Sequence, residues 1–166
     1  VGVFRGSDYL RFGRGVIYNG VDIDKTYSGW NPGDVYISST GYPVKDPELR
    51  IIGDPNPDWT GSIRTSFTLF DDLQISALFD FFQGGDVHNG TLGALMYFGT
   101  AQETENRGKK IVFEGYGPGA GQEVALDQSY YQGIGSSFNG PASLGVEDGS
   151  YVKLREIAVA YTLRSE

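Results

Sequence analysis

Two neighbouring stretches of alternating apolar and polar residues constrain the fold of this chain more than any other feature. Residues 62–70 read SIRTSFTLF and residues 73–82 read LQISALFDFF, and in both stretches the odd-numbered positions are mainly apolar. Because successive side chains of a β-strand point to opposite faces, each stretch predicts a strand with one apolar face. The short connection at residues 70–72 predicts a β-hairpin in which Asp72 takes the left-handed conformation that such a loop requires.

The polar face of this hairpin carries two charged residues that are candidates for a functional role. The hairpin register places Arg64 and Asp80 on the same polar face and predicts a diagonal contact between them. Asp86 lies close to Asp80 in sequence, but two glycines separate it from the strand. We therefore interpret these two carboxylates as lining or turn residues and not as the paired acids of a glycoside hydrolase.

A third strand is predicted at residues 150–163, SYVKLREIAVAYTL. In its second half the odd positions 157–163 form an apolar face, yet Lys153 and Arg155 share the parity of that face. A single flat apolar face therefore cannot run along the whole strand. We expect the apolar band to cover only the last stretch, with the first stretch standing in water beyond the edge of a membrane.

The remaining parts of the chain contain one weaker strand and two long irregular segments. The weaker strand is predicted within residues 1–13, and the long segments span about residues 14–61 and 84–149, with a short helix near residues 91–98. Short turns that alternate with long external loops are typical of outer-membrane β-barrels. The predicted fold class is all-β, with about four antiparallel strands of a transmembrane β-barrel. Because a barrel needs about eight strands, residues 1–166 are expected to be a fragment of a barrel domain.

Composition excludes several classes of function. The chain has 25 Gly, 11 Tyr and 10 Phe, which favours a β protein rich in turns, and it has no Cys and a single His, His88. Thiol chemistry, zinc–cysteine sites and two-histidine metal sites are therefore not available to it. A net charge of −8 disfavours nucleic acid as a partner. We predict no catalytic residues, no metal and no cofactor, and do not expect an enzyme.

Two motifs imitate known binding loops without completing them. Residues 53–61, GDPNPDWTG, space three oxygen-bearing side chains like a calcium loop, but Trp59 stands where that loop needs glycine and Thr65 where it needs glutamate. Residues 109–121, KKIVFEGYGPGAG, contain a Gly-x-Gly-x-x-Ala pattern, but Pro118 and the glycines around it prevent the helix start of a dinucleotide site. We interpret the first motif as the entry into a strand and the second as a flexible external loop.

Five pieces of the sequence together suggest a known family. They are IIGDPNPDWTGSI (51–63), ISALFDFFQGGDVHNGT (75–91), FGTAQETENRG (98–108), IVFEG (111–115) and VEDGSYVKLREIAVAYTL (146–163). In this order and approximate spacing they resemble the late barrel strands of the SusC/RagA family of TonB-linked outer-membrane transporters, and the resemblance covers roughly residues 41–163. It implies a plugged barrel in the outer membrane of a Gram-negative bacterium that imports oligosaccharides or peptides, with a SusD-like surface lipoprotein and TonB as partners. The plug and the TonB-contacting segment have no counterpart in the sequence.

Candidate contact residues follow from this interpretation. Arg64 and Asp80 are expected to face the barrel lumen. Four tyrosines in the second long segment are candidates for stacking on a sugar ring or contacting a lipoprotein lid. Two other functions stay open: a secreted carbohydrate-binding β-sandwich and a smaller outer-membrane barrel that does not use TonB. A sandwich buries its apolar strand face against a second sheet, whereas a barrel exposes it to lipid. The four tyrosines are Tyr97, Tyr116, Tyr130 and Tyr131.

Overall fold

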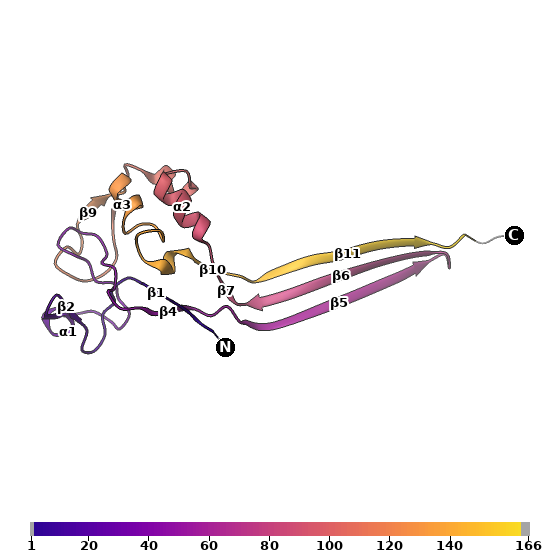
Figure 1. Ribbon diagram of the computed structural model, residues 1–166, viewed down its shortest axis with the longest axis horizontal. Coiled ribbons are helices and arrows are strands. Elements are labelled where there is room, and N and C mark those ends of the chain that lie inside the picture. Colours follow the sequence, from indigo (N-terminus) through magenta and orange to yellow (C-terminus); the bar gives the residue numbers. More distant parts are fainter. Residues whose placement is uncertain (1, 164–166) are drawn as a thin grey trace. The chain divides into compact units, whose positions relative to one another are not determined.

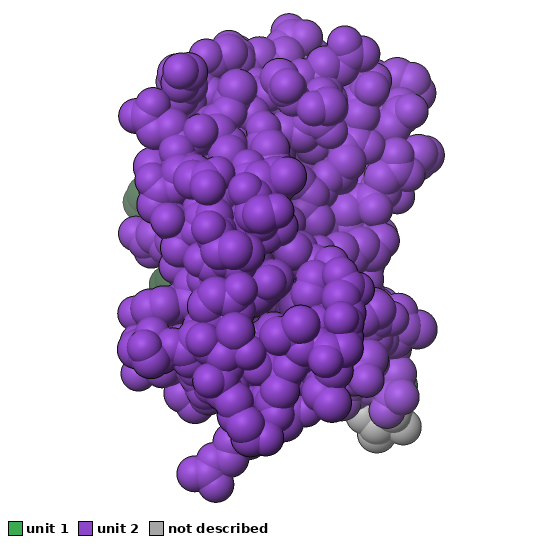
Figure 2. Space-filling view, turned by 90° about the vertical axis from the view of Figure 1, so that its left-hand side faces the viewer, with its two compact units in different colours: residues 1–2, 54–87, 147–166 green, residues 3–53, 88–146 purple. Residues whose placement is uncertain are grey.

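The computed structural model describes residues 2–163, which are mostly β-structure in antiparallel sheets. The described chain forms two compact units (Figures 1 and 2). Unit 1 comprises residues 2, 54–87 and 147–163, and unit 2 comprises residues 3–53 and 88–146. None of the helices in the described chain is long and apolar enough to cross a membrane.

Unit 1 is built on one three-stranded antiparallel sheet. Its strands are β5 (Pro57–Leu69), β6 (Leu73–Gly84) and β11 (Tyr151–Tyr161), in the order β11-β6-β5 (Figure 1). Leu69 pairs with Leu73, so the hairpin predicted from the alternating residues is confirmed. The third predicted strand is also present and pairs with β6 on the side opposite β5.

The turn of the hairpin differs from the prediction. Phe70 and Asp71 have positive φ angles of 53° and 61°, whereas Asp72 does not take the left-handed conformation, so that prediction is wrong. Two consecutive residues with positive φ give the turn the twist that matches the flanking strands. The carbonyl oxygen of Asp72 instead accepts a hydrogen bond of 2.8 Å from the backbone N–H of Thr162, beyond the end of β11.

A β-bulge in β11 corrects the expectation for the third strand. Leu154 pairs with Phe79 and Glu156 pairs with Leu78, so Arg155 is an extra residue with no partner position on β6. The extra residue reverses the parity of β11, which puts Lys153 and the apolar residues after the bulge on opposite faces. The apolar face therefore runs the full length of the strand, and its predicted restriction to the second half is wrong.

The strand predicted within residues 1–13 is much shorter than expected, and it does not pair with the long sheet. Only β1 (Phe4–Gly6) forms there, and it pairs with β4 (Arg50–Gly53) in unit 2 and not with the long sheet. The same region supplies core residues, because Leu10 and Phe12 are each only 2% exposed. Its apolar residues are therefore used in packing within unit 2, which limits the pairing to three residues.

Unit 2 is folded from the two segments that the sequence left as long loops. The predicted short helix is present as α2, where the side chain of Asn89 accepts a hydrogen bond from Leu92 N–H and Gly99 ends the helix in the left-handed conformation. Strands β7 (Asp86–His88) and β10 (Val146–Asp148) form a two-stranded sheet. The other elements are β2 (Ile17–Tyr18), β3 (Val21–Asp22), α1 (Ile23–Thr26), α2 (Gly90–Phe98), η1 (Gln102–Asn106), β8 (Lys110–Val112), β9 (Glu123–Ala125), α3 (Gln128–Gln132) and η2 (Ala142–Gly145).

An aromatic cluster forms the core of unit 2. The ring of Phe12 stacks on Trp30 with centroids 5.4 Å apart and meets the edge of Tyr116 at 6.2 Å. Tyr36 is 8% exposed and packs on the same ring, and burial raises its pKa to about 12. Phe12 comes from residues 1–13, Trp30 and Tyr36 from the first long segment and Tyr116 from the second, so the aromatic packing joins segments that lie far apart in the sequence.

The Gly-x-Gly-x-x-Ala motif is a site of close backbone packing and not a flexible loop. Tyr116 N–H donates to the carbonyl of Val35 at 3.0 Å, and Ile37 N–H donates to the carbonyl of Tyr116 at 2.8 Å. A Cβ atom at Gly115 or Gly117 would overlap the carbonyl oxygen of Val35 or Ile37, respectively. Glycine is required there because two backbones touch.

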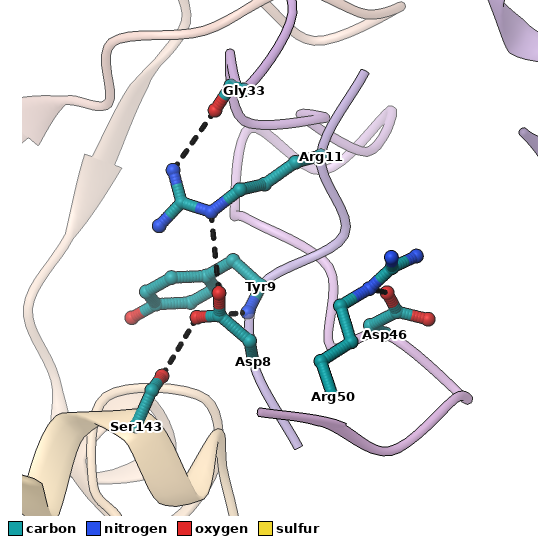
Figure 3. A network of polar contacts seen from close by, with 7 residues as sticks. All are labelled: Asp8, Tyr9, Arg11, Gly33, Asp46, Arg50 and Ser143. Carbon is teal, nitrogen blue, oxygen red and sulfur yellow. Dashed lines mark hydrogen bonds and ion pairs between the residues drawn. The ribbon is translucent and has the colours of Figure 1, made fainter. Parts of the chain in front are cut away.

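A polar network fixes another long-range contact of unit 2 (Figure 3). The Asp8 carboxylate accepts hydrogen bonds from Ser143 Oγ at 2.7 Å, from Tyr9 N–H at 2.8 Å and from Arg11 Nε at 3.3 Å. Arg11 also donates to the carbonyl of Gly33 at 2.9 Å. Burial alone would raise the pKa of Asp8, but these donors hold it below its usual value of 3.8. Through the Asp8 carboxylate, the network ties residues 8–11 to Ser143 of η2.

Candidate functional site

The first candidate site is the apolar face of the sheet in unit 1. Its side chains lie in five successive rows across β5, β6 and β11. Five large apolar side chains in these rows are 58–66% exposed, namely Ile63, Phe67, Ile157, Val159 and Tyr161. An exposed apolar patch of this extent indicates contact with a lipid or protein surface. The rows are Gly61–Phe81–Val152, Ile63–Phe79–Leu154, Thr65–Ala77–Ile157, Phe67–Ile75–Val159 and Leu69–Leu73–Tyr161.

The length of this face is close to the thickness of a membrane. On β5 the rows run from Gly61 to Leu69, and at about 3.3 Å per residue this span is about 26 Å. A strand tilted by about 40°, as in membrane barrels, covers about 20 Å of height over that distance. Extension to Trp59 brings the height to about 25 Å, which is the apolar band of an outer-membrane barrel.

Trp59 marks one end of the apolar face. Its indole stacks on Phe81 with centroids 6.4 Å apart and an interplanar angle of 28°, and it is 53% exposed. The indole lies over Gly61, where a Cβ atom would be 3.4 Å from the ring. The tryptophan therefore packs on the backbone of β5 at Gly61 as well as on Phe81 of β6. Aromatic residues at the ends of an apolar band are the pattern of a membrane interface.

Residues 53–61 form the entry into β5, as predicted. The Asp54 side chain accepts hydrogen bonds from the backbone N–H of Asn56 at 2.9 Å and from the Asn56 side-chain amide. These hydrogen bonds lower the pKa of Asp54, the backbone N–H contributing most. The two residues thus form a local turn, after which β5 begins at Pro57.

The opposite face of the sheet is polar and contains ion pairs. The Asp80 carboxylate accepts from Ser62 Oγ at 2.7 Å and pairs with Arg155 Nε at 2.5 Å. Arg64 Nη2 lies 3.0 Å from a carboxylate oxygen of Glu156. Arg64 and Asp80 do share this face, but the predicted contact between them is wrong. Arg64 pairs with Glu156 instead because both residues stand in one row, on either side of Leu78.

The four candidate tyrosines do not form one site. Tyr131 is 4% exposed and donates from its hydroxyl to the carbonyl of Glu103 at 2.9 Å, and burial raises its pKa. Tyr130 stacks on Tyr42 with centroids 5.9 Å apart. Tyr116 belongs to the core cluster described above and also lines a cavity of about 510 Å³. The rings of Tyr130 and Tyr131 meet edge to face with centroids 5.0 Å apart. Tyr97 and Tyr131 both line the wall of a second cavity.

The cavity shared by Tyr97 and Tyr131 has a volume of about 250 Å³ and lies within unit 2. Sequence reasoning missed its other wall residues, which come from α2, α3 and the segment after η1. One sequence signal was available: Asp127 is a typical helix N-cap, and its side chain accepts from the N–H of Tyr130 at 2.9 Å. The missed residues are Met96, Phe98, Gly99, Arg107, Gln128 and Gln132.

Comparison with known proteins adds no relative. No family model matches the chain, and a search of curated proteins finds no match either.

Proposed function

We propose that this chain is part of the barrel domain of a TonB-dependent outer-membrane transporter of the SusC/RagA type, which imports oligosaccharides or peptides. The observation that carries the proposal is the contrast between the two faces of the sheet β11-β6-β5. One face is apolar, exposed and about 26 Å long, and the other carries the paired charges of Asp80, Arg155, Arg64 and Glu156. The sequence resemblance supplies the family.

Lipid is the partner that best fits the apolar face. In a soluble β-sandwich this face is buried against a second sheet about 10 Å away, and its side chains interdigitate with those of that sheet. Here Ile157 and Val159 are 64% and 66% exposed, whereas the ion pairs occupy the other face. In the proposed barrel further strands pair with the edges of β5 and β11, because about eight strands are needed for closure.

Unit 2 provides the external part of the proposed transporter. Its two long segments pack into one compact body with an aromatic core, so the mouth of the barrel has a fixed surface on which a substrate or a SusD-like lipoprotein can dock. Arg64 and Asp80 face the lumen, and TonB acts through a plug domain. The chain itself performs no chemistry on the substrate.

Nitroxide scanning tests the proposal in the full-length protein reconstituted in lipid vesicles. Single cysteines on a cysteine-free background carry the label at Phe67 and Val159 on the apolar face, with Ser66 and Ala158 as matched neighbours on the polar face. Collisions with oxygen should dominate at the first pair, and collisions with a water-soluble nickel complex at the second. If the apolar-face labels are inaccessible to both reagents, the face is covered by protein and a sandwich is the correct fold.

Uptake by living cells separates the transporter from a smaller passive barrel. In a strain without TonB, import of the substrate should stop while the protein remains in the outer membrane. Import that continues at the same rate without TonB would exclude TonB-dependent transport, even if the strand faces behave as expected.

A further inference from the structure

The cavity in unit 2 shared by Tyr97 and Tyr131 combines an aromatic wall with hydrogen-bonding groups and one cation. Tyr97 packs on Phe98 with centroids 5.2 Å apart and on Phe138 at 5.1 Å. Phe98 is 73% exposed and Phe138 is 60% exposed, so this aromatic group is not completed by packing within the chain. Exposed aromatic faces in a loop region are well suited to stack on a flat or cyclic ligand.

Two glutamines form part of the wall of the same cavity. Gln128 and Gln132 stand four residues apart on α3, so they lie on one face of this short helix, and both line the cavity. Each amide offers two donors and an acceptor, the set that recognises hydroxyl groups. Tyr131, between them in sequence, forms a buried part of the wall because its hydroxyl is held by the carbonyl of Glu103.

The guanidinium of Arg107 is the cation of this cavity and is held in place on one side. Its Nε donates to the carbonyl of Thr104 at 3.1 Å, and its Nη1 lies against Gly99, where a Cβ atom would be only 3.1 Å away. Gly99 has a φ of 73° and ends α2, so a larger residue there is disfavoured by conformation as well as by space. The remaining N–H groups of Arg107 are available to a ligand.

No acidic side chain neutralises Arg107 in the part of the chain that the structure describes, where five other ion pairs form. Asp127, the acidic residue next to Gln128, directs one carboxylate oxygen to Ser129 Oγ at 2.7 Å and to the N–H of Tyr130. An unpaired, partly ordered guanidinium in the wall of a cavity favours an anionic ligand, and a planar carboxylate matches its fork of donors.

We propose that this cavity binds a sugar ring that carries a carboxylate, such as a uronic acid unit of an acidic oligosaccharide. The ring stacks on Phe98, and its edge meets Tyr97, whose plane is at 86° to that of Phe98. The hydroxyls bond to Gln128 and Gln132, and the carboxylate pairs with Arg107. A volume of about 250 Å³ suits a single ring, since cavities for larger drug-sized ligands begin at about 300 Å³. The inference rests on the proposed function, in which this unit meets the cargo before import.

Saturation-transfer NMR on the full-length protein in detergent micelles tests the site with glucuronate, glucose and acetate as probes. Glucuronate should bind at least about tenfold more tightly than either of the others, with the strongest transfer to its ring protons, because only it offers both the ring and the carboxylate. Its affinity should fall as salt is raised, whereas that of glucose should not.

Two variants assign the effect to the cavity. Arg107→Gln should lower the affinity for glucuronate by at least about tenfold and leave glucose unchanged. Lys109→Gln is the matched control, because Lys109 lies two residues away and its ammonium bonds to Asn106 outside the cavity wall. Thermal unfolding of both variants checks that they fold.

Three results would overturn the assignment: no binding of glucuronate, equal affinity for glucose or acetate, or an Arg107→Gln variant that binds as the unmodified protein does. Nitroxide accessibility of the strands, measured on the same protein in vesicles, is independent of the cavity. A failure of the ligand site is thereby distinguished from a failure of the transporter proposal.

Discussion

Arginine scanning along β11 should reveal a depth profile if the apolar face lies in lipid. Ile157 belongs to the third of the five rows, with Val152 in the first row and Tyr161 in the last. On β5, each end row is four residues from the middle row, a distance of about 13 Å along the strand. At a strand tilt of about 40° this distance corresponds to about 10 Å along the membrane normal. Ile157 is therefore near the middle of the proposed bilayer, and the other two are near its interfaces.

The magnitudes follow from this placement. An arginine on the lipid face costs about 2–4 kcal/mol at the midplane of a membrane barrel and about 0–1 kcal/mol near the interfaces. Ile157→Arg should therefore lower the free energy of unfolding by about 3 kcal/mol, and Val152→Arg and Tyr161→Arg by about 1 kcal/mol or less. Ala158→Arg, on the polar face beside Ile157, is the matched control and should cost less than about 1 kcal/mol.

The assay is urea unfolding of the full-length protein in dilauroylphosphatidylcholine vesicles, followed by the heat-dependent shift in electrophoretic mobility that folded barrels show. Values below about 0.5 kcal/mol at all three apolar positions would place this face in water and refute the reasoning. Large costs at all three positions, without a minimum at either end, would indicate a protein core, where a buried unpaired charge is costly at every depth.

Three further predictions concern other features. Gly117→Ala should destabilise unit 2 by at least about 3 kcal/mol in urea-dependent proteolysis, because its Cβ overlaps a carbonyl, whereas Gly121→Ala, with open space around it, should cost about 1 kcal/mol. The stability contributed by the low pKa of Asp8 is complete above pH 3.8 and lost as pH falls through the lower folded value, so Asp8→Asn should reduce the acid-induced loss of stability seen in urea midpoints. Deletion of Arg155 should leave assembly in the outer membrane intact, measured by fractionation, because the other residues of β11 keep their partners on β6 and the apolar face stays complete.

The sequence predicted the hairpin because its signal is local. The period-2 alternation in residues 62–70 and 73–82 is a property of each strand, and a short connection leaves few alternative registers. The bulge at Arg155 depends on which residues of β6 stand opposite, and this pairing is not contained in the strand itself. The shared parity of Lys153 and Ile157 was nevertheless a visible sign of it, since one extra residue resolves the conflict.

Most of unit 2 and its cavity were outside the reach of sequence reasoning. Phe12 meets Tyr116, and Asp8 meets Ser143, across more than one hundred residues in each case, with no periodic pattern on either side. The sequence predicted a flexible external loop around Gly117, and the close approach of its backbone to Ile37 is known only from the fold. The tyrosines were selected for their type, and residue type alone does not separate a core ring from one in a cavity wall.

The bulge itself bears on the surroundings of the sheet. If the register of Ile157 and Val159 is kept, a regular strand would place both Lys153 and Arg155 on the apolar face, whereas the bulge leaves Lys153 opposite Asp80 and lets Arg155 pair with Asp80 on the polar face. A bulge disrupts the ladder locally, and one lost hydrogen bond costs about 0.5–1.5 kcal/mol. In water an exposed arginine costs about 0.5 kcal/mol or less, so a regular strand is preferred there. In lipid the same arginine costs about 2–4 kcal/mol near the midplane, which exceeds the cost of the bulge. The position of Arg155 therefore supports the proposal that the apolar face lies in lipid.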